Sequence, residues 1–110
     1  MKQSQISTAS SGSIKDRMYA GDKELILEHL SANSTALGNA LAIGACVKNR
    51  FSDARIAQLL IALERSSETV LGVRVGDLAT AALHELGIKQ YAGNDPGINA
   101  MIAEHFSFAL

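Results

Sequence analysis

The residues of this chain that could do acid–base or metal chemistry are three histidines, each beside a glutamate. They form the dipeptides Glu28-His29, His84-Glu85 and Glu104-His105. Adjacent helical positions point about 100° apart, so the two side chains of one dipeptide cannot jointly hold a metal ion or share a proton. The sequence has no HExxH motif, no cysteine pair and no Asp-rich loop. We expect solvated or capping histidines, with His105 partly buried; a zinc site drawn from three separate helices is the alternative.

Other catalytic patterns are also missing from the sequence. The stretch GVRVG, residues 72–76, has neither a phosphate-loop lysine nor GxGxxG spacing, and no serine lies in a nucleophile elbow. The single cysteine, Cys46, lies in the apolar segment AIGACV and is predicted to be a small buried thiol. The sequence therefore predicts a protein that is not an enzyme, with no cofactor, no metal and no small-molecule ligand.

Composition restricts the classes of partner. The 110 residues carry a formal net charge of -1, which gives no general attraction to nucleic acid or anionic lipid. The longest apolar run, Ala40 to Val47, is far shorter than the ~20 residues of a membrane span. No positively charged start is followed by an apolar segment, and one cysteine cannot form an internal disulfide. These features predict a cytoplasmic protein without a membrane partner.

The pattern of apolar residues divides the chain into an arm and one helical domain. Residues 1–20 are rich in Ser and Gln and are predicted to be a polar N-terminal arm, in which Ile14 and Met18 could form one helical turn against the rest. Residues 21–110 alternate helix and turn and are predicted to be a single domain. We expect an all-α fold without a sheet, with five helices near residues 22–31, 34–49, 53–66, 73–87 and 95–107.

Caps and apolar stripes support these helices. Asp22, Asp53 and Asp95 are the predicted N-caps, and Gly87 is the predicted stop of the fourth helix. Four helices have apolar residues at helical spacing: Ile26, Leu27 and Leu30; Ile56, Leu59, Leu60 and Leu63; Val75, Leu78, Ala79, Ala82 and Leu86; Ile98, Met101 and Ile102. Leu60 is expected to meet Leu78 in the core. The glycines of the second helix, Gly38 and Gly44, suggest close approach by its neighbours.

The helices also repeat along the chain. DARIAQLLIAL, from Asp53, and DPGINAMIAEH, from Asp95, align without a gap, and the intervening helices share the Ala-rich middles LAIGA and LATAA. Helices of two types therefore alternate in units of roughly 35 to 40 residues, a period typical of stacked helical arrays.

The segment Asp53 to Gly87 resembles a HEAT-type repeat. An amphipathic first helix is followed by a turn, and Val73-Arg74 then opens an Ala-rich second helix that ends in HELG. This resemblance implies a short irregular α-solenoid of two and a half helical hairpins.

The polar faces of the two Ala-rich helices are the predicted binding surface. Arg74, Asp77 and His84 lie opposite the apolar stripe of the fourth helix, and Asn39 and Asn49 do so on the second helix. In stacked arrays such second helices line the concave binding side. We therefore predict these five residues as partner-binding residues.

The resulting hypothesis is a non-catalytic protein-binding module. Helical-repeat immunity proteins exist, so the resemblance allows a bacterial immunity-type protein that binds and neutralises a toxin domain. The main alternative is an adaptor or regulatory subunit. A DNA-binding regulator is a weaker alternative, because a helix presenting Arg74, Asp77, Thr80 and His84 has few groups for reading a groove. A cofactor-free enzyme is the remaining alternative, after the immunity-type and adaptor roles.

Overall fold

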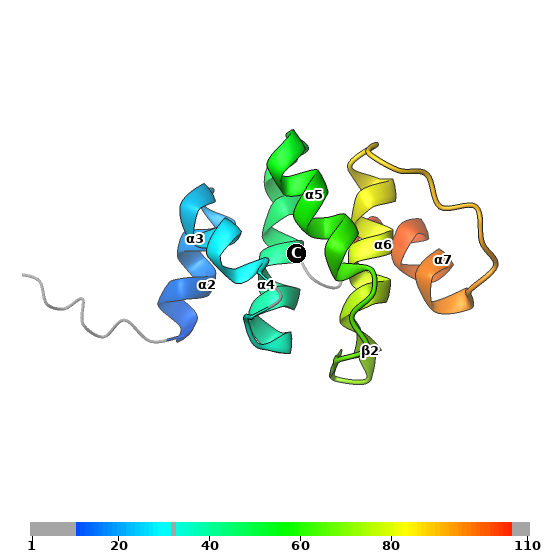
Figure 1. Cartoon of the computed structure of the whole chain (residues 1–110), viewed down its shortest axis with the longest axis horizontal. Coiled ribbons are helices and arrows are strands. Elements are labelled where there is room, and N and C mark those ends of the chain that lie inside the picture. The colour runs from blue at the N-terminus through cyan, green and yellow to red at the C-terminus, as the bar shows by residue number, and fades with distance from the viewer. Residues whose placement is uncertain (1–10, 32, 107–110) are drawn as a thin grey trace, which may run out of the picture.

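The computed structural model describes residues 11–31 and 33–106, and these residues are mostly helical (Figure 1). The elements in chain order are α2 (Ser11–Tyr19), α3 (Lys23–His29), α4 (Ala36–Asn49), α5 (Ala54–Leu63), β1 (Thr69–Val70), β2 (Val73–Arg74), α6 (Val75–Glu85) and α7 (Pro96–Ala103). The predicted helical fold is confirmed, and the five predicted helices correspond to α3–α7. The prediction that the fold has no sheet is wrong, because β1 and β2 form a two-stranded ladder. Residues 1–10 of the predicted arm and residue 107 of the predicted fifth helix lie outside the described residues.

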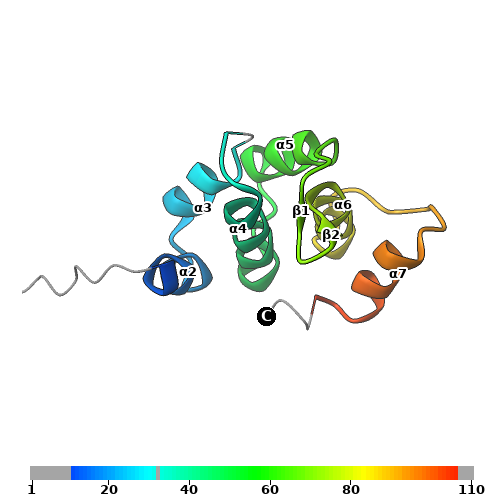
Figure 2. The ribbon, with the colours of Figure 1, turned by 90° about the horizontal axis from the view of Figure 1, so that it is seen from below.

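The two Ala-rich helices, α4 and α6, are at the centre of the molecule. They pack against each other, α2 and α3 pack on α4, and α5 and α7 pack on α6. Figure 2 shows α2 and α3 on one side of α4, with α5 and α7 on opposite sides of α6. Alanines in the central helices allow this close packing because their side chains are short.

Side-chain caps define where most helices begin. The side chains of Asp22, Thr35 and Asp95 each accept a backbone N–H from the first turn of α3, α4 and α7. Asp53 is the N-cap residue of α5 but forms no side-chain cap bond; its carboxylate pairs instead with Lys23 Nζ at 2.7 Å. The predicted caps at Asp22 and Asp95 are confirmed, whereas Asp53 ties the start of α5 to the start of α3.

The predicted stripes form the core. The buried members of these stripes are Ile26, Leu30, Ile56, Leu60, Leu63, Val75, Leu78, Ala79, Ala82, Ile98 and Met101. The expected contact of the arm is also confirmed, since Met18 of α2 is fully buried and Ile14 packs against the core. The expected partial burial of His105 is wrong. Helix α7 ends at Ala103 and the chain turns left-handed at His105 and Phe106, which buries Phe106 and exposes His105.

Residues 69–74 form a hairpin where the sequence predicted a loop and the start of a helix. Val70 pairs with Val73, and the two turn residues, Leu71 and Gly72, both have positive φ angles of 52° and 83°. Positive φ at both central positions is the type I′ turn that joins short antiparallel strands. Helix α6 then begins at Val75 rather than at Val73, because Val73-Arg74 is extended in β2.

Two helical glycines mark close approaches between elements. A Cβ on Gly38 would lie 3.1 Å from Cδ2 of His29 at the end of α3, which confirms the close approach of a neighbouring helix expected there. A Cβ on Gly76 would lie 2.5 Å from the carbonyl oxygen of Glu64, just after α5. Gly76 thus lets the first turn of α6 pack against the end of α5 and fixes where the hairpin projects.

Candidate functional site

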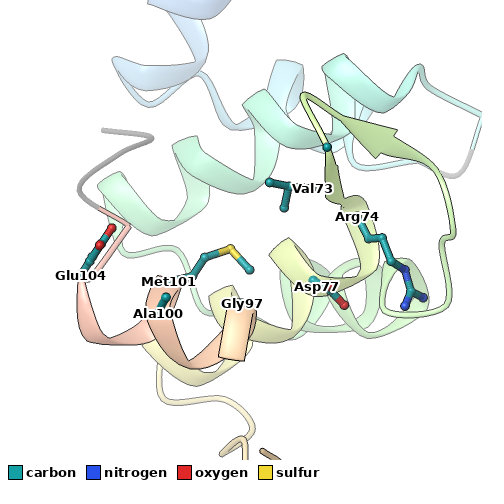
Figure 3. A pocket seen from close by; sticks show the side chains of 8 residues that line it. Val73, Arg74, Asp77, Gly97, Ala100, Met101 and Glu104 are labelled. Carbon is teal, nitrogen blue, oxygen red and sulfur yellow. The ribbon is translucent and has the colours of Figure 1, made fainter. Parts of the chain in front are cut away.

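A cleft of about 390 Å³ lies between the β hairpin, the start of α6 and one face of α7 (Figure 3). Its lining residues come from all three elements: Gly72, Val73, Arg74, Asp77, Gly97, Ala100, Met101 and Glu104. Arg74 and Asp77, two of the predicted partner-binding residues, are therefore brought together in one site.

Local structure explains how the cleft is formed. Gly97, Ala100, Met101 and Glu104 follow the i, i+3, i+4, i+7 spacing that places residues on one helical face. Gly97 and Ala100 have little or no side chain, so this face of α7 is hollow next to Met101. On the other side, β2 leads directly into α6, which places Arg74 one turn before Asp77.

The cleft combines an apolar floor with charged ends. Met101 is 8% exposed and Val73 is half-buried, and Figure 3 shows their side chains near the middle of the cleft. Arg74 and Asp77 lie at one end, and Glu104 lies at the other. None of these three charged side chains forms an ion pair or hydrogen bond with another described residue. The cleft thus offers an apolar surface and unpaired charges of both signs.

Leu71, at the tip of the hairpin beside the cleft, is 99% exposed and has a φ angle of 52°. Two other large hydrophobic residues of the described chain are exposed, Leu37 at 56% and Ile61 at 45%. A left-handed conformation costs a residue such as Leu roughly 1–2 kcal/mol. Leu71 is therefore unfavourable for folding both in its conformation and in its exposure.

Asn39, one of the predicted partner-binding residues, is buried. It is 3% exposed, and its Nδ2 donates to the carbonyl oxygens of His29 at 2.7 Å and Ser31 at 3.0 Å. The prediction that this face of the second helix is an open polar surface is wrong, because Ala42 and Cys46 on the same face are also buried. Burial raises the pKa of the Cys46 thiol to about 12.

The side-chain amide of Asn49 also forms hydrogen bonds with backbone carbonyl groups. Its Nδ2 donates to the carbonyl oxygen of Ala45 at 2.9 Å and to those of Met18 and Tyr19 at 3.3 Å each. The side chain is half-buried and joins the end of α4 to the end of α2. Asn49 thereby accounts for part of the packing of α2 on the core.

His84 does not line the cleft with Arg74 and Asp77. Its Nδ1 accepts the backbone N–H of Tyr91 at 3.0 Å, which leaves the proton of the neutral ring on Nε2. The Tyr91 hydroxyl in turn accepts the backbone N–H of Asp95 at 2.9 Å. These two bonds hold the loop that leads from α6 to α7.

The histidines do not gather with other ligand-type residues. Within residues 11–31 and 33–106, no group of three His, Cys, Asp or Glu side chains could hold a metal ion. His29 contacts the carbonyl oxygen of Leu25 within its own helix, and His105 contacts Glu85 at 3.2 Å. Glu85 also pairs with Arg50, so this cluster joins the ends of α4, α6 and α7.

Sequence reasoning missed six of the eight lining residues of the cleft, Met101 and Glu104 among them, and it also missed the exposed Leu71 beside the cleft. Met101 was assigned to a core stripe, which its burial supports, but one edge of it also floors the cleft. The sequence TVLGVRV did contain a usable signal, because β-branched residues flank a glycine at a turn. No comparable signal marked Glu104.

No described helix has the length and apolar character needed to cross a membrane. Comparison with protein-family models, with curated proteins and with solved structures gives no match to this chain.

Proposed function

We propose that this chain is a non-catalytic protein-binding module and that the hairpin tip and the adjacent cleft are its binding surface. The observation that carries the proposal is Leu71, a large apolar side chain that is 99% exposed in a left-handed conformation. Strained residues persist where the surrounding structure holds them, and they cluster at functional positions. Leu71 lies next to an apolar cleft with unpaired charges, as expected for a contact that a partner completes.

The more specific form of the proposal is an immunity-type protein that neutralises a bacterial toxin domain. Its support is the resemblance of Asp53–Gly87 to a HEAT-type repeat, which also underlies the proposal that the helix pairs form a short α-solenoid. The arrangement of α5 and α7 on opposite sides of α6 is compatible with alternating helix types. An adaptor or regulatory subunit would use the same surface, so the partner decides between the two roles.

A binding experiment with matched variants tests the surface. The wild-type chain, Leu71→Glu and Ile61→Glu would each be immobilised and exposed to extract of the native host, and retained proteins would be identified and their affinities measured. We expect Leu71→Glu to lose a partner that Ile61→Glu retains, because Ile61 is exposed on α5 away from the cleft lining. Arg74→Ala should weaken the same complex by about 1–3 kcal/mol. Equal retention by Leu71→Glu and wild type would contradict the proposed surface.

The immunity role needs a separate readout. The neighbouring gene would be sequenced, and any toxin-like domain that it encodes would be expressed in a sensitive bacterium with either the wild-type chain or Leu71→Glu. Growth with wild type alone would support immunity. Binding of a host complex without any protection would support the adaptor role.

A further inference from the structure

The surface around the cleft carries both halves of an interface. Leu71 protrudes at the hairpin tip, and beside it the cleft is hollow over Met101. The same surface has a guanidinium group, Arg74, and two carboxylates, Asp77 beside it and Glu104 at the far end, none of which is paired with a described residue. A protrusion with a hollow, and a cation with an anion, are what a patch needs in order to bind a copy of itself.

We infer that a second copy of this chain occupies the cleft in a two-fold symmetric dimer. The inference rests on the proposed function, since it takes this surface to be a protein-binding surface and names its occupant. In such a contact, if one residue of the first copy touches a second residue of the other copy, that second residue of the first copy also touches the first residue of the other copy. The contact between a protruding Leu71 and the hollow over Met101 therefore occurs twice in the dimer.

The placement of the elements agrees with this symmetry. Figure 3 shows the hairpin and Arg74 at one end of the cleft, and α7 with Glu104 at the opposite end. A two-fold axis through the middle of the cleft exchanges these ends. The hairpin of each copy then lies over α7 of the other, and the end that holds Arg74 and Asp77 in each copy faces Glu104 of the other. Arg74 of each copy then lies between two carboxylates, its own Asp77 and the other copy's Glu104.

The apolar residues fit the same arrangement. The hairpin that crosses to the second copy carries Leu71 at its tip, and the α7 face that it meets has only Gly97 and Ala100 beside Met101. Small residues at that face leave room for a leucine side chain. Burial of Leu71 in the dimer removes from water the most exposed large hydrophobic residue of the described chain.

Charge exchange gives a sharp test of the symmetry. Sedimentation velocity of the full chain, from micromolar to near-millimolar concentration, would be measured for wild type, Arg74→Glu, Glu104→Lys and the double variant. We expect a reversible wild-type dimer, a dissociation constant about tenfold or more higher in each single variant, and recovery to about threefold of wild type in the double variant. Glu is tolerated at the start of α6 and Lys at the end of α7, because each sign suits that helix end.

Matched apolar variants complete the experiment. Leu71→Glu should abolish the dimer, while Ile61→Glu should leave it unchanged, with circular dichroism confirming that every variant is folded. A wild-type chain that is monomeric at every concentration would overturn the inference, as would a double variant no better than the single ones. If that monomer still retained a host protein that Leu71→Glu loses, the occupant would be a different protein and the proposed function would stand. If Leu71→Glu changed neither measurement, both would fail.

Discussion

The two central helices, α4 and α6, have similar sequences but use their polar residues differently. Both are rich in Ala, and the sequence pattern predicts a polar face on each of them. In α4 the amides of Asn39 and Asn49 donate to backbone carbonyls of neighbouring segments. At the start of α6, Arg74 and Asp77 have no described partner and lie at an open cleft.

The difference follows from how the neighbours cover each helix. Helix α4 is packed by α2, α3 and α6, so polar side chains on its surface meet the loops and helix ends of those neighbours. The first turn of α6 is packed by the end of α5 through Gly76, but its other side faces the cleft between the hairpin and α7. A polar stripe on an Ala-rich helix thus becomes structural where neighbours surround it and available for binding where they do not.

The largest effect expected from this comparison is that of Asn39→Ala. It would remove the amide that donates to the carbonyl oxygens of His29 and Ser31. The Ser31 oxygen keeps the backbone N–H of Ser34 at 3.0 Å, so the His29 oxygen is the one that loses its partner. Loss of a partner for buried polar groups costs about 1–3 kcal/mol, so the free energy of unfolding should fall by that amount. Urea denaturation followed by circular dichroism measures it.

Arg74→Ala is the matched control for that experiment. Because Arg74 is exposed and unpaired among the described residues, its removal should change the free energy of unfolding by less than about 0.5 kcal/mol. Equal destabilisation by the two substitutions would show that the structural and the available polar residues have been misassigned.

Much of the fold could be predicted from the sequence because it depends on local patterns. Apolar residues at helical spacing identified Leu60 and Leu78 as core residues, and Asp22 and Asp95 were recognised as caps. The hairpin was missed because its strands have only two residues each, which is too short for a clear alternating pattern.

The site was only partly predictable because tertiary packing creates it. Arg74 and Asp77 were found from their position opposite an apolar stripe. Glu104 was not found, because α7 reaches the hairpin only after a loop held by His84 and Tyr91. The burial of Asn39 could not be predicted either, since its partners are carbonyl groups at the end of α3 and in the turn after it, and the sequence pattern does not specify where that turn lies.

A second prediction separates folding from binding at the hairpin. Leu71→Asn would place Asn-Gly at the two positive-φ positions, the pair preferred in type I′ turns. Because Asn tolerates the left-handed region better than Leu, the free energy of unfolding should rise by about 0.5–1 kcal/mol. The same substitution should weaken binding at the cleft.

The two measurements are denaturation and sedimentation velocity on the same preparations. A rise in stability together with weaker self-association would show that Leu71 is retained for contact with another chain. A fall in stability would mean instead that Leu71 supports the fold of its own chain.

The smallest expected effect is on how the free energy of unfolding changes at acid pH. It concerns two carboxyl groups, Asp22 before α3 and Asp53 before α5. A hydrogen bond from Arg17, at 2.8 Å, holds the pKa of Asp22 below its usual value, and a hydrogen bond from Lys23 does the same for the pKa of Asp53. A carboxyl group with a lower pKa in the folded chain stabilises the fold above its unfolded pKa of about 4, and this stabilisation is lost as the pH falls through the folded value. Stability should therefore decline below about pH 4.

Removing both carboxylates tests the source of that decline. The double variant Asp22→Asn, Asp53→Asn keeps residues that can cap α3 and α5, since Asn is a good N-cap, but neither amide titrates. Its stability should depend less steeply on pH below about pH 4 than that of wild type, as measured by thermal unfolding across the acid range. The difference should be small and should shrink with added salt, because both pairs are solvent-exposed. An unchanged pH slope in the double variant would show that the acid dependence arises from other groups. The carboxylates of Asp22 and Asp53 would then not stabilise the fold through their ion pairs.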